Sequence, residues 1–123
     1  MSDDLYREII LDRYRDPQFK GELKSADVDV SESNPLCGDE LRVQLKFDSS
    51  QRVSEVGWTG QGCAISLSSA DMLAEKLVGM SIEEIRTLDK DDILSMMGID
   101  PGPTRLKCAL LSLSTVKKGL AES

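Results

Sequence analysis

Apolar and polar residues alternate most regularly in the middle of the chain, where they predict two neighbouring strands. Residues 41–47 (LRVQLKF) place an apolar side chain at every second position, and residues 53–59 (VSEVGWT) follow after the turn DSSQR. A period of two is typical of a strand with one buried face. Two such strands joined by a short loop predict an antiparallel hairpin. A shorter alternating piece, residues 28–30 (VDV), lies in a segment that we expect to be a loop.

Apolar residues recur at helical spacing on both sides of this hairpin. Before it, residues 3–15 predict a helix that ends ahead of Pro17, because the residue before a proline disfavours helix. After it, helical spacing or capping signals continue almost to the end of the chain, over residues 66–79, 81–88, 89–99 and 105–121. Ser66 and Ser81 are the expected N-caps of the first two of these helices. The order helix, hairpin, helices predicts an α+β fold, with helices packed on one face of a small antiparallel sheet.

Composition and charge narrow the class of protein. The chain has 123 residues, of which 40% are hydrophobic, so we expect one domain over residues 1–123. The net charge of −7 argues against binding to nucleic acid or to anionic membranes, both of which need clustered Lys and Arg. No apolar run is long enough to span a bilayer, and the acidic start lacks a signal-peptide pattern. We therefore expect a cytoplasmic protein.

Three cysteines and the absence of histidine limit the available chemistry. An odd number of cysteines in a reducing compartment disfavours a disulfide framework. Without histidine, Ser-His-Asp and Cys-His catalysis are excluded, and any metal must be held by sulfur and oxygen. No C-x-x-C motif is present, so neither a zinc ribbon nor a thioredoxin-type dithiol is indicated.

The cysteines lie at the boundaries of predicted elements. Cys37 precedes a strand, Cys63 follows a strand just before a helix, and Cys108 is expected in the first turn of the last helix. A helix N-terminus stabilises a thiolate, which is the form that binds metal. If the three boundaries meet at one end of the sheet, three sulfurs and the Asp39 carboxylate suit tetrahedral zinc or iron. The alternative is that each cysteine is a small buried apolar residue.

The sequence around these residues resembles the U-type iron–sulfur cluster scaffold family, the IscU, NifU N-terminal and SufU group. NPLCGDELRVQL, WTGQGCAISLSSADMLAEKLVG and RLKCALLSLSTVKKGL are similar, in this order, to the three cysteine motifs of the family. LYREIILDRYRDPQFKGEL is similar to its N-terminal helix and the loop that follows. The resemblance covers nearly the whole chain, and it implies the α+β fold of the family with a metal site at one end of the sheet.

The resemblance also implies a site and its partners. Cys37, Asp39, Cys63 and Cys108 would bind zinc, or iron and a transient [2Fe–2S] cluster. A cysteine desulfurase of the SufS or IscS type would supply sulfur, and iron–sulfur acceptor proteins would receive the product. Cys108, at an exposed helix start, would be the first persulfide acceptor, and Arg105 would contact the desulfurase.

Two branches of the family differ near the third cysteine. Lys107 stands where IscU-like members usually carry histidine, and PGPTR replaces their chaperone-binding motif. We therefore do not expect an Hsp70-type chaperone as a partner. PTRLKC resembles the SufU-like motif, but the segment between Cys63 and Cys108 is too short for the insertion that SufU-like members usually carry. The chain combines a SufU-like site with an IscU-like length.

Three function classes stay open. The first is an iron–sulfur assembly protein that accepts sulfur and acts as a scaffold or as a sulfur relay. The second is a small module in which the same ligands hold a structural zinc that supports only the fold. The third, a redox enzyme, is disfavoured by the missing vicinal dithiol. Whether the protein is an enzyme is left open by the sequence.

Overall fold

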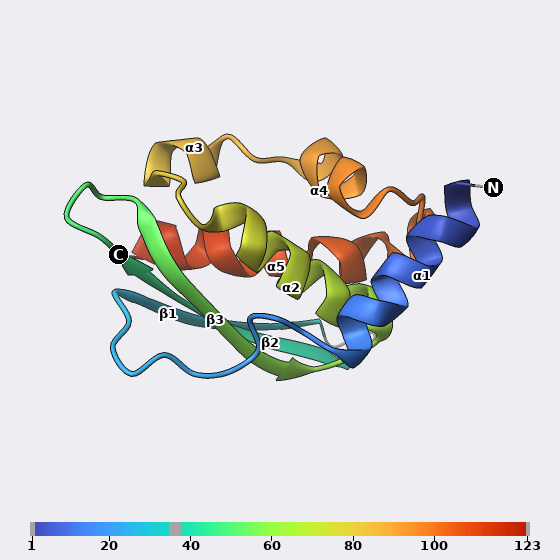
Figure 1. Cartoon of the computed structure of the whole chain (residues 1–123), viewed down its shortest axis with the longest axis horizontal. Helices are drawn as coiled ribbons and strands as arrows, with labels where there is room; N and C mark the ends of the chain where they lie inside the picture. Colours follow the sequence, from blue (N-terminus) through green and yellow to red (C-terminus); the bar gives the residue numbers. More distant parts are fainter. Residues whose placement is uncertain (1, 35–37, 123) are drawn as a thin grey trace.

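The computed structural model describes residues 2–34 and 38–122 as five helices and three strands (Figure 1). In chain order these are α1 (Ser2–Arg15), β1 (Val28–Asn34), β2 (Asp39–Phe47), β3 (Val53–Gln61), α2 (Ala64–Leu77), α3 (Ile82–Arg86), α4 (Lys90–Met97) and α5 (Gly102–Glu122). None of these helices is both long enough and apolar enough to cross a bilayer.

The strands form one antiparallel sheet in the order β1-β2-β3. Val43 in the central strand pairs with Val30 on one side and Trp58 on the other. Alternation along β2 buries Leu41, Val43 and Leu45, as the sequence pattern predicts. The predicted hairpin is therefore confirmed, but β1 is a full strand where a loop was expected.

The helices cover one face of this sheet. Helices α2 and α5 pack side by side on the strands, α1 packs against α2, and α3 and α4 lie on the far side of α2 and α5 (Figure 1). The core between these layers is mainly aliphatic. It includes Leu45, Leu73, Leu77 and Ile93, each of which is at most 1% exposed. The α+β architecture with helices on one face is confirmed.

Of the predicted helix starts, that of α3 is confirmed, and those of α2 and α5 need correction. Ser81 caps α3 with a complete capping box, as expected. Helix α2, however, begins at Ala64 and is capped by Cys63, because the Cys63 sulfur accepts a hydrogen bond from the Ser66 backbone N–H. Helix α5 begins at Gly102, three residues before its predicted start, so Cys108 lies in the second turn.

A buried carboxylate fastens α1 and the following loop to α2 and β3. Asp71 is fully buried in α2. Its Oδ1 atom accepts hydrogen bonds from the Phe19 backbone at 2.7 Å and from the Trp58 indole at 2.9 Å. Its Oδ2 atom accepts from the Gln18 backbone at 2.9 Å and from the Arg13 guanidinium at 3.1 Å. Trp58 thus belongs to the core. Asp71 lies within a helical segment, and no local sequence signal marks it as a connecting residue.

Candidate metal centre

Three of the four predicted ligands converge at one end of the sheet. Asp39 is the first residue of β2, Cys63 lies between β3 and α2, and Cys108 lies in α5. One carboxylate oxygen and the two sulfurs all lie within 4.8 Å of one another. The prediction that distant element boundaries meet here is confirmed for these residues. Cys37, the fourth predicted ligand, lies outside the described residues.

Asp39 is placed in the site by the alternation of β2. Asp39 and Leu41 are two positions apart in β2, so their side chains point to the same, helix-covered face of the sheet. The Asp39 side chain is 1% exposed there. Its Oδ1 atom accepts a hydrogen bond from the Cys63 backbone N–H at 3.0 Å, and its Oδ2 atom lies 3.9 Å from the Cys63 sulfur. Both carboxylate oxygens of Asp39 thus lie next to Cys63, one bound to its backbone N–H and the other beside its sulfur.

Two glycines allow the chain before Cys63 to pass close to β2, Gly62 beside the Asp39 carboxylate and Gly60 beside the Glu40 backbone. A Cβ atom on Gly62 would lie 2.4 Å from Asp39 Oδ1 and 2.9 Å from its Cγ atom. Gly60 has a φ of +152°, and a Cβ atom there would lie 2.1 Å from the Glu40 carbonyl oxygen. No side chain fits at either distance. The G-x-G preceding Cys63 is therefore required by close packing as well as by turn geometry.

The two described cysteines differ in accessibility. Cys63 is half-buried, and the N–H of Ser66 in the first turn of α2 donates to its sulfur at 3.4 Å. This confirms the predicted placement of Cys63 at a helix N-terminus. Cys108 is only 1% exposed and lies beyond the first turn of α5, so the expected exposed helix start is wrong for this residue. The error follows from the earlier start of α5 at Gly102.

Arg105 adds positive charge beside both sulfurs. Its side chain is exposed, and the pKa of its guanidinium is raised, first by a hydrogen bond to the Cys63 sulfur and then by attraction to the sulfurs of Cys63 and Cys108. Lys107, two positions further along α5, is also exposed. Of the two cations, Arg105 is the one placed to act on the sulfur pair.

The donor atoms fit a metal ion. Zinc bonded to sulfur and oxygen at ~2.0–2.3 Å holds its ligands within about 4 Å of one another, so these three donors need to contract only slightly. Two sulfurs with one carboxylate suit zinc or iron better than magnesium or calcium, which prefer oxygen ligands alone. The described residues therefore offer a partial ligand set of the predicted kind.

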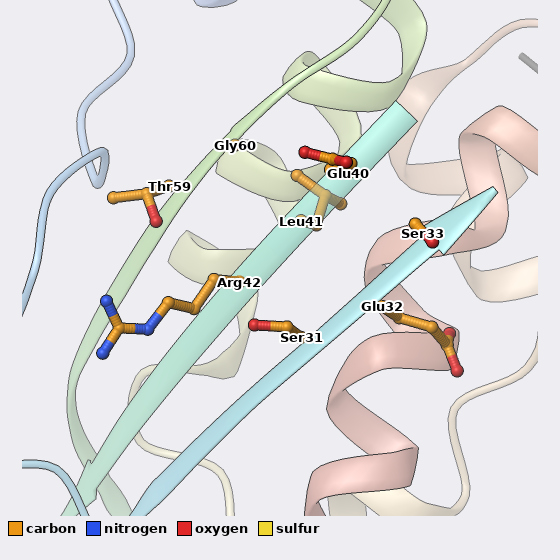
Figure 2. Close-up of a pocket in the computed structure, with 8 residues that line it drawn as sticks. All are labelled: Ser31, Glu32, Ser33, Glu40, Leu41, Arg42, Thr59 and Gly60. Carbon is orange, nitrogen blue, oxygen red and sulfur yellow. The ribbon is translucent and has the colours of Figure 1, made fainter. Parts of the chain in front are cut away.

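The opposite face of the sheet carries a polar hollow of about 390 Å³ (Figure 2). Ser31, Arg42 and Thr59 lie in a row across its three strands. The Arg42 guanidinium is bound by Asp29 and Glu22, with N–O distances of 2.7 and 2.8 Å. These ion pairs compensate the positive charge of Arg42, and Asp39 points to the other face of the sheet.

Comparison with known proteins settles the family. The model of the NifU-like N-terminal domain matches residues 5–122. The chain belongs to this family. The family resemblance that the cysteine motifs indicated is thereby confirmed, and the match extends over residues 5–122.

Individual relatives cover almost the entire NifU-like domain. The zinc-dependent sulfurtransferase SufU of Bacillus subtilis is 34% identical over 137 residues, which cover 98% of this chain and 92% of that protein. The iron–sulfur cluster assembly scaffold protein IscU of Thermotoga maritima is 31% identical, with 94% and 92% covered. Both branches named in the sequence analysis are thus represented.

Solved structures agree on the fold. A crystal structure described as an iron–sulfur cluster assembly scaffold protein for the SUF system, from Fervidobacterium islandicum, matches with a TM-score of 0.77 and 26% identity, covering 92% of this chain and 94% of that one. A NifU-like N-terminal protein from Brucella abortus matches with a TM-score of 0.77 over 98% of this chain and 94% of that one. Its 21% identity supports the fold alone.

Proposed function

We propose that this NifU-like domain is an iron–sulfur cluster assembly protein that accepts sulfur from a cysteine desulfurase. The observation that carries the proposal is the convergence of Asp39, Cys63 and Cys108, whose donor atoms lie within 4.8 Å of one another. The names of the relatives point the same way, since one is a sulfurtransferase and the other a cluster scaffold. Thiols next to a carboxylate and an exposed arginine suit sulfur transfer better than hydrolysis or phosphate chemistry.

Asp39, Cys63 and Cys108 would hold the metal, with Cys37 as the fourth ligand that the family resemblance implies. Bound zinc would keep the cysteines as thiolates between transfers, because a metal-bound thiol is deprotonated. Iron, in contrast, would be cargo that combines with the delivered sulfur. The same residues would serve as ligands in both cases.

Sulfur is transferred by attack of a thiolate on the outer sulfur of the desulfurase persulfide. A new S–S bond forms on this chain, and the desulfurase cysteine leaves as a thiolate. The family resemblance implies Cys108 as the first acceptor, but Cys108 is 1% exposed whereas Cys63 is half-buried. Between these two we assign the acceptor role to Cys63. Arg105, exposed and next to both sulfurs, would contact the desulfurase where the persulfide arrives.

Asp39 gives the site a ligand that is released more easily than sulfur. A carboxylate oxygen is a harder and more exchangeable ligand for iron than a thiolate. We predict that Asp39→Ala retains an assembled [2Fe–2S] cluster longer than wild type when an acceptor protein is added, as measured by the decay of its visible absorption. Asp39→Asn is the control, because it keeps an acceptor for the Cys63 N–H but not the charge. Equal decay in wild type and Asp39→Ala would show that Asp39 does not control release.

Mass spectrometry under non-denaturing conditions tests the proposed function directly. The chain is incubated with a cysteine desulfurase, cysteine and Fe²⁺, and its mass is compared with that of the untreated chain. A gain of sulfur alone indicates a relay, and a gain of iron with sulfide indicates a scaffold. A chain that binds zinc and gains no sulfur under any condition contradicts the proposal and favours the structural module.

A further inference from the structure

Two sulfur atoms of different accessibility lie next to each other in the site. The Sγ atoms of Cys63 and Cys108 are within 4.8 Å of each other. Cys63 is half-buried at the junction of β3 and α2, whereas Cys108 is 1% exposed inside α5. A partner protein therefore reaches the Cys63 sulfur before that of Cys108. The Cys108 sulfur is placed to react with a sulfur atom that Cys63 has accepted.

We propose that Cys108 is the resolving thiol of this site, which attacks a persulfide on Cys63 and releases its outer sulfur as hydrogen sulfide. This role rests on the proposed function, because the desulfurase supplies the persulfide. It goes beyond a relay, in which the sulfur stays at the oxidation level of a persulfide. Sulfide is the oxidation level of the sulfur within an iron–sulfur cluster, so the step would convert delivered sulfur into the form that iron binds.

The step balances without an external reductant. A bond forms between the Sγ atoms of Cys108 and Cys63, and the bond between Cys63 Sγ and the outer sulfur breaks. The electron pair of the broken bond leaves with the outer sulfur, which is reduced to hydrosulfide and takes up the proton of the attacking thiol. The Cys108 sulfur is oxidised from the thiol to the disulfide level, and the Cys63 sulfur keeps the oxidation level that it had in the persulfide. One persulfide and one thiol thus give one disulfide and one hydrogen sulfide.

The arrangement of the chain favours this attack. A disulfide bond is ~2.0 Å long, so the two sulfurs must approach by at most about 2.8 Å. Cys63 is the N-cap at the end of α2, where its carbonyl accepts the Leu67 N–H, whereas Cys108 lies inside α5 with helical turns on both sides. The approach therefore needs movement mainly of the Cys63 side chain. Two thiols fixed this close react far faster than thiols free in solution. Arg105 contacts both sulfurs and supplies positive charge where the anion departs.

Attack on the outer sulfur of the persulfide is the competing reaction. It would move the sulfur to Cys108 without oxidising any cysteine and without releasing sulfide. The product would place an additional sulfur atom on a side chain that is 1% exposed, in a helix that packs against α2 and the sheet. The burial of Cys108 therefore favours attack on the inner sulfur, and the two reactions leave different products on the chain.

A single-turnover experiment separates these outcomes. The metal-free chain carries Cys37→Ser, so that only Cys63 and Cys108 remain as thiols. It is mixed with persulfidated desulfurase from which free cysteine has been removed. Sulfide release and the intact mass of the alkylated chain are then followed with time. The comparison variants add Cys108→Ser or Cys63→Ser to the same background, and circular dichroism confirms that each is folded.

In the Cys37→Ser chain we expect sulfide release together with loss of two hydrogens from the mass, at a rate roughly tenfold or more above that of the Cys37→Ser/Cys108→Ser chain. The latter should instead retain one added sulfur on Cys63, and Cys37→Ser/Cys63→Ser should form no disulfide. A persulfide that persists equally with and without Cys108, or that appears on Cys108, would overturn the resolving role while leaving sulfur acceptance intact. Failure of the wild-type chain and of every variant to take up sulfur would overturn both, whereas uptake by the wild-type chain alone would overturn only the roles of Cys63 and Cys108.

Discussion

Asp39 is an ionisable side chain at a strand position where the alternation of β2 otherwise buries leucine and valine. Burying a carboxylate costs several kcal/mol unless it is paired or bound. At this position the Cys63 N–H and the neighbouring sulfur provide part of the compensation. A buried acid that breaks the pattern of its own strand is the kind of local conflict that marks functional sites.

Gly62 offers a test of how the site holds this acid. In Gly62→Ala, the new Cβ atom would overlap Asp39 Oδ1 and Cγ, so the carboxylate must leave its present position beside Cys63. We expect the affinity for zinc to fall by ~10–100-fold, as is typical when a residue that orients a metal ligand is changed. Titration against a chromophoric chelator measures this fall.

The matched control is another closely packed glycine that lies away from the site. A Cβ atom on Gly119 in α5 would lie 2.7 Å from Val30 and 2.8 Å from Val28. Gly119→Ala should therefore lower stability by ~1–3 kcal/mol through overpacking, partly offset by about 1 kcal/mol of helix propensity. It should leave zinc affinity unchanged. If both variants lose affinity equally, general destabilisation explains the effect and Gly62 does not position Asp39.

The sequence could predict most of the site because the relevant signals are local. Turn residues and strand ends around Asp39 and Cys63 indicated that both lie at element boundaries, and the structure brings them together. The burial of Cys108 could not be predicted, because it depends on where α5 begins. Gly102 and Pro103 are ordinary loop signals in sequence, yet they form the first turn of the helix.

At the scale of elements, Asp71 in α2 connects α1, the loop that follows it and β3 through four hydrogen bonds. We expect Asp71→Ala to lower the free energy of unfolding by ~3–5 kcal/mol, because three N–H groups lose their acceptor and the partly buried Arg13 keeps only the exposed Glu75 as an ion-pair partner. Unfolding in urea measures the change. Since small domains are stable by only about 5–15 kcal/mol, this variant should be close to unfolding at ambient temperature.

Glu75 provides the control for Asp71, because it pairs with the same arginine from the surface. Its carboxylate lies 2.7 Å from the Arg13 guanidinium but is 59% exposed. Exposed ion pairs contribute ~0–1 kcal/mol, so Glu75→Ala should change stability little. A similar loss in both variants would mean that Arg13, and not the buried network around Asp71, fastens α1.

The capping box of α3 gives the fold a pH-dependent component. The pKa of Glu84 is lowered, first by the hydrogen bond from the Ser81 backbone and then by the Arg52 guanidinium. A lowered pKa means that the stabilisation is fully present above the unfolded pKa of ~4.3 and is lost as the pH falls through the lower folded value. Wild type should therefore exceed Glu84→Gln in stability at neutral pH and lose this advantage in acid. Urea unfolding of both proteins from neutral pH to about pH 3 measures the difference.

Glu83 lies in the same first turn and serves as the control for Glu84. Glu83→Gln removes one negative charge near the helix N-terminus without touching the hydrogen bonds to Ser81 and Arg52. Its stability relative to wild type should vary less with pH. An equal pH dependence in the two variants would assign the effect to the helix dipole instead of the capping box.

The missed strand β1 shows a limit of pattern reasoning at this scale. Its first half, with Val28 and Val30, is apolar on the buried face, but its second half is Ser-Glu-Ser-Asn. These polar residues form a strand because β2 supplies backbone partners along the whole length of β1. Pairing of this kind depends on tertiary contacts and is not visible in local periodicity.

At the scale of the whole molecule, most of the core lies away from the metal site. The apolar core runs along α2, α5 and the sheet, whereas Asp39, Cys63 and Cys108 lie at one end of that sheet. The order of elements was enough to predict helices on one face, because an amphipathic sheet must bury one side and the helices following it can reach that side. It follows that the fold has a source of stability independent of any ion.

Metal removal tests this independence and separates the assembly protein from the structural zinc module. We expect the chelated chain to keep its far-ultraviolet circular dichroism spectrum, because the core does not depend on the ligands. Its melting temperature should fall by several degrees or more, since an ion present at 1,000 times its dissociation constant stabilises the folded state by ~4 kcal/mol. Addition of zinc should restore the original melting temperature. Loss of helical signal on chelation would contradict the expectation, because a domain that unfolds without its metal uses that metal as part of its structure.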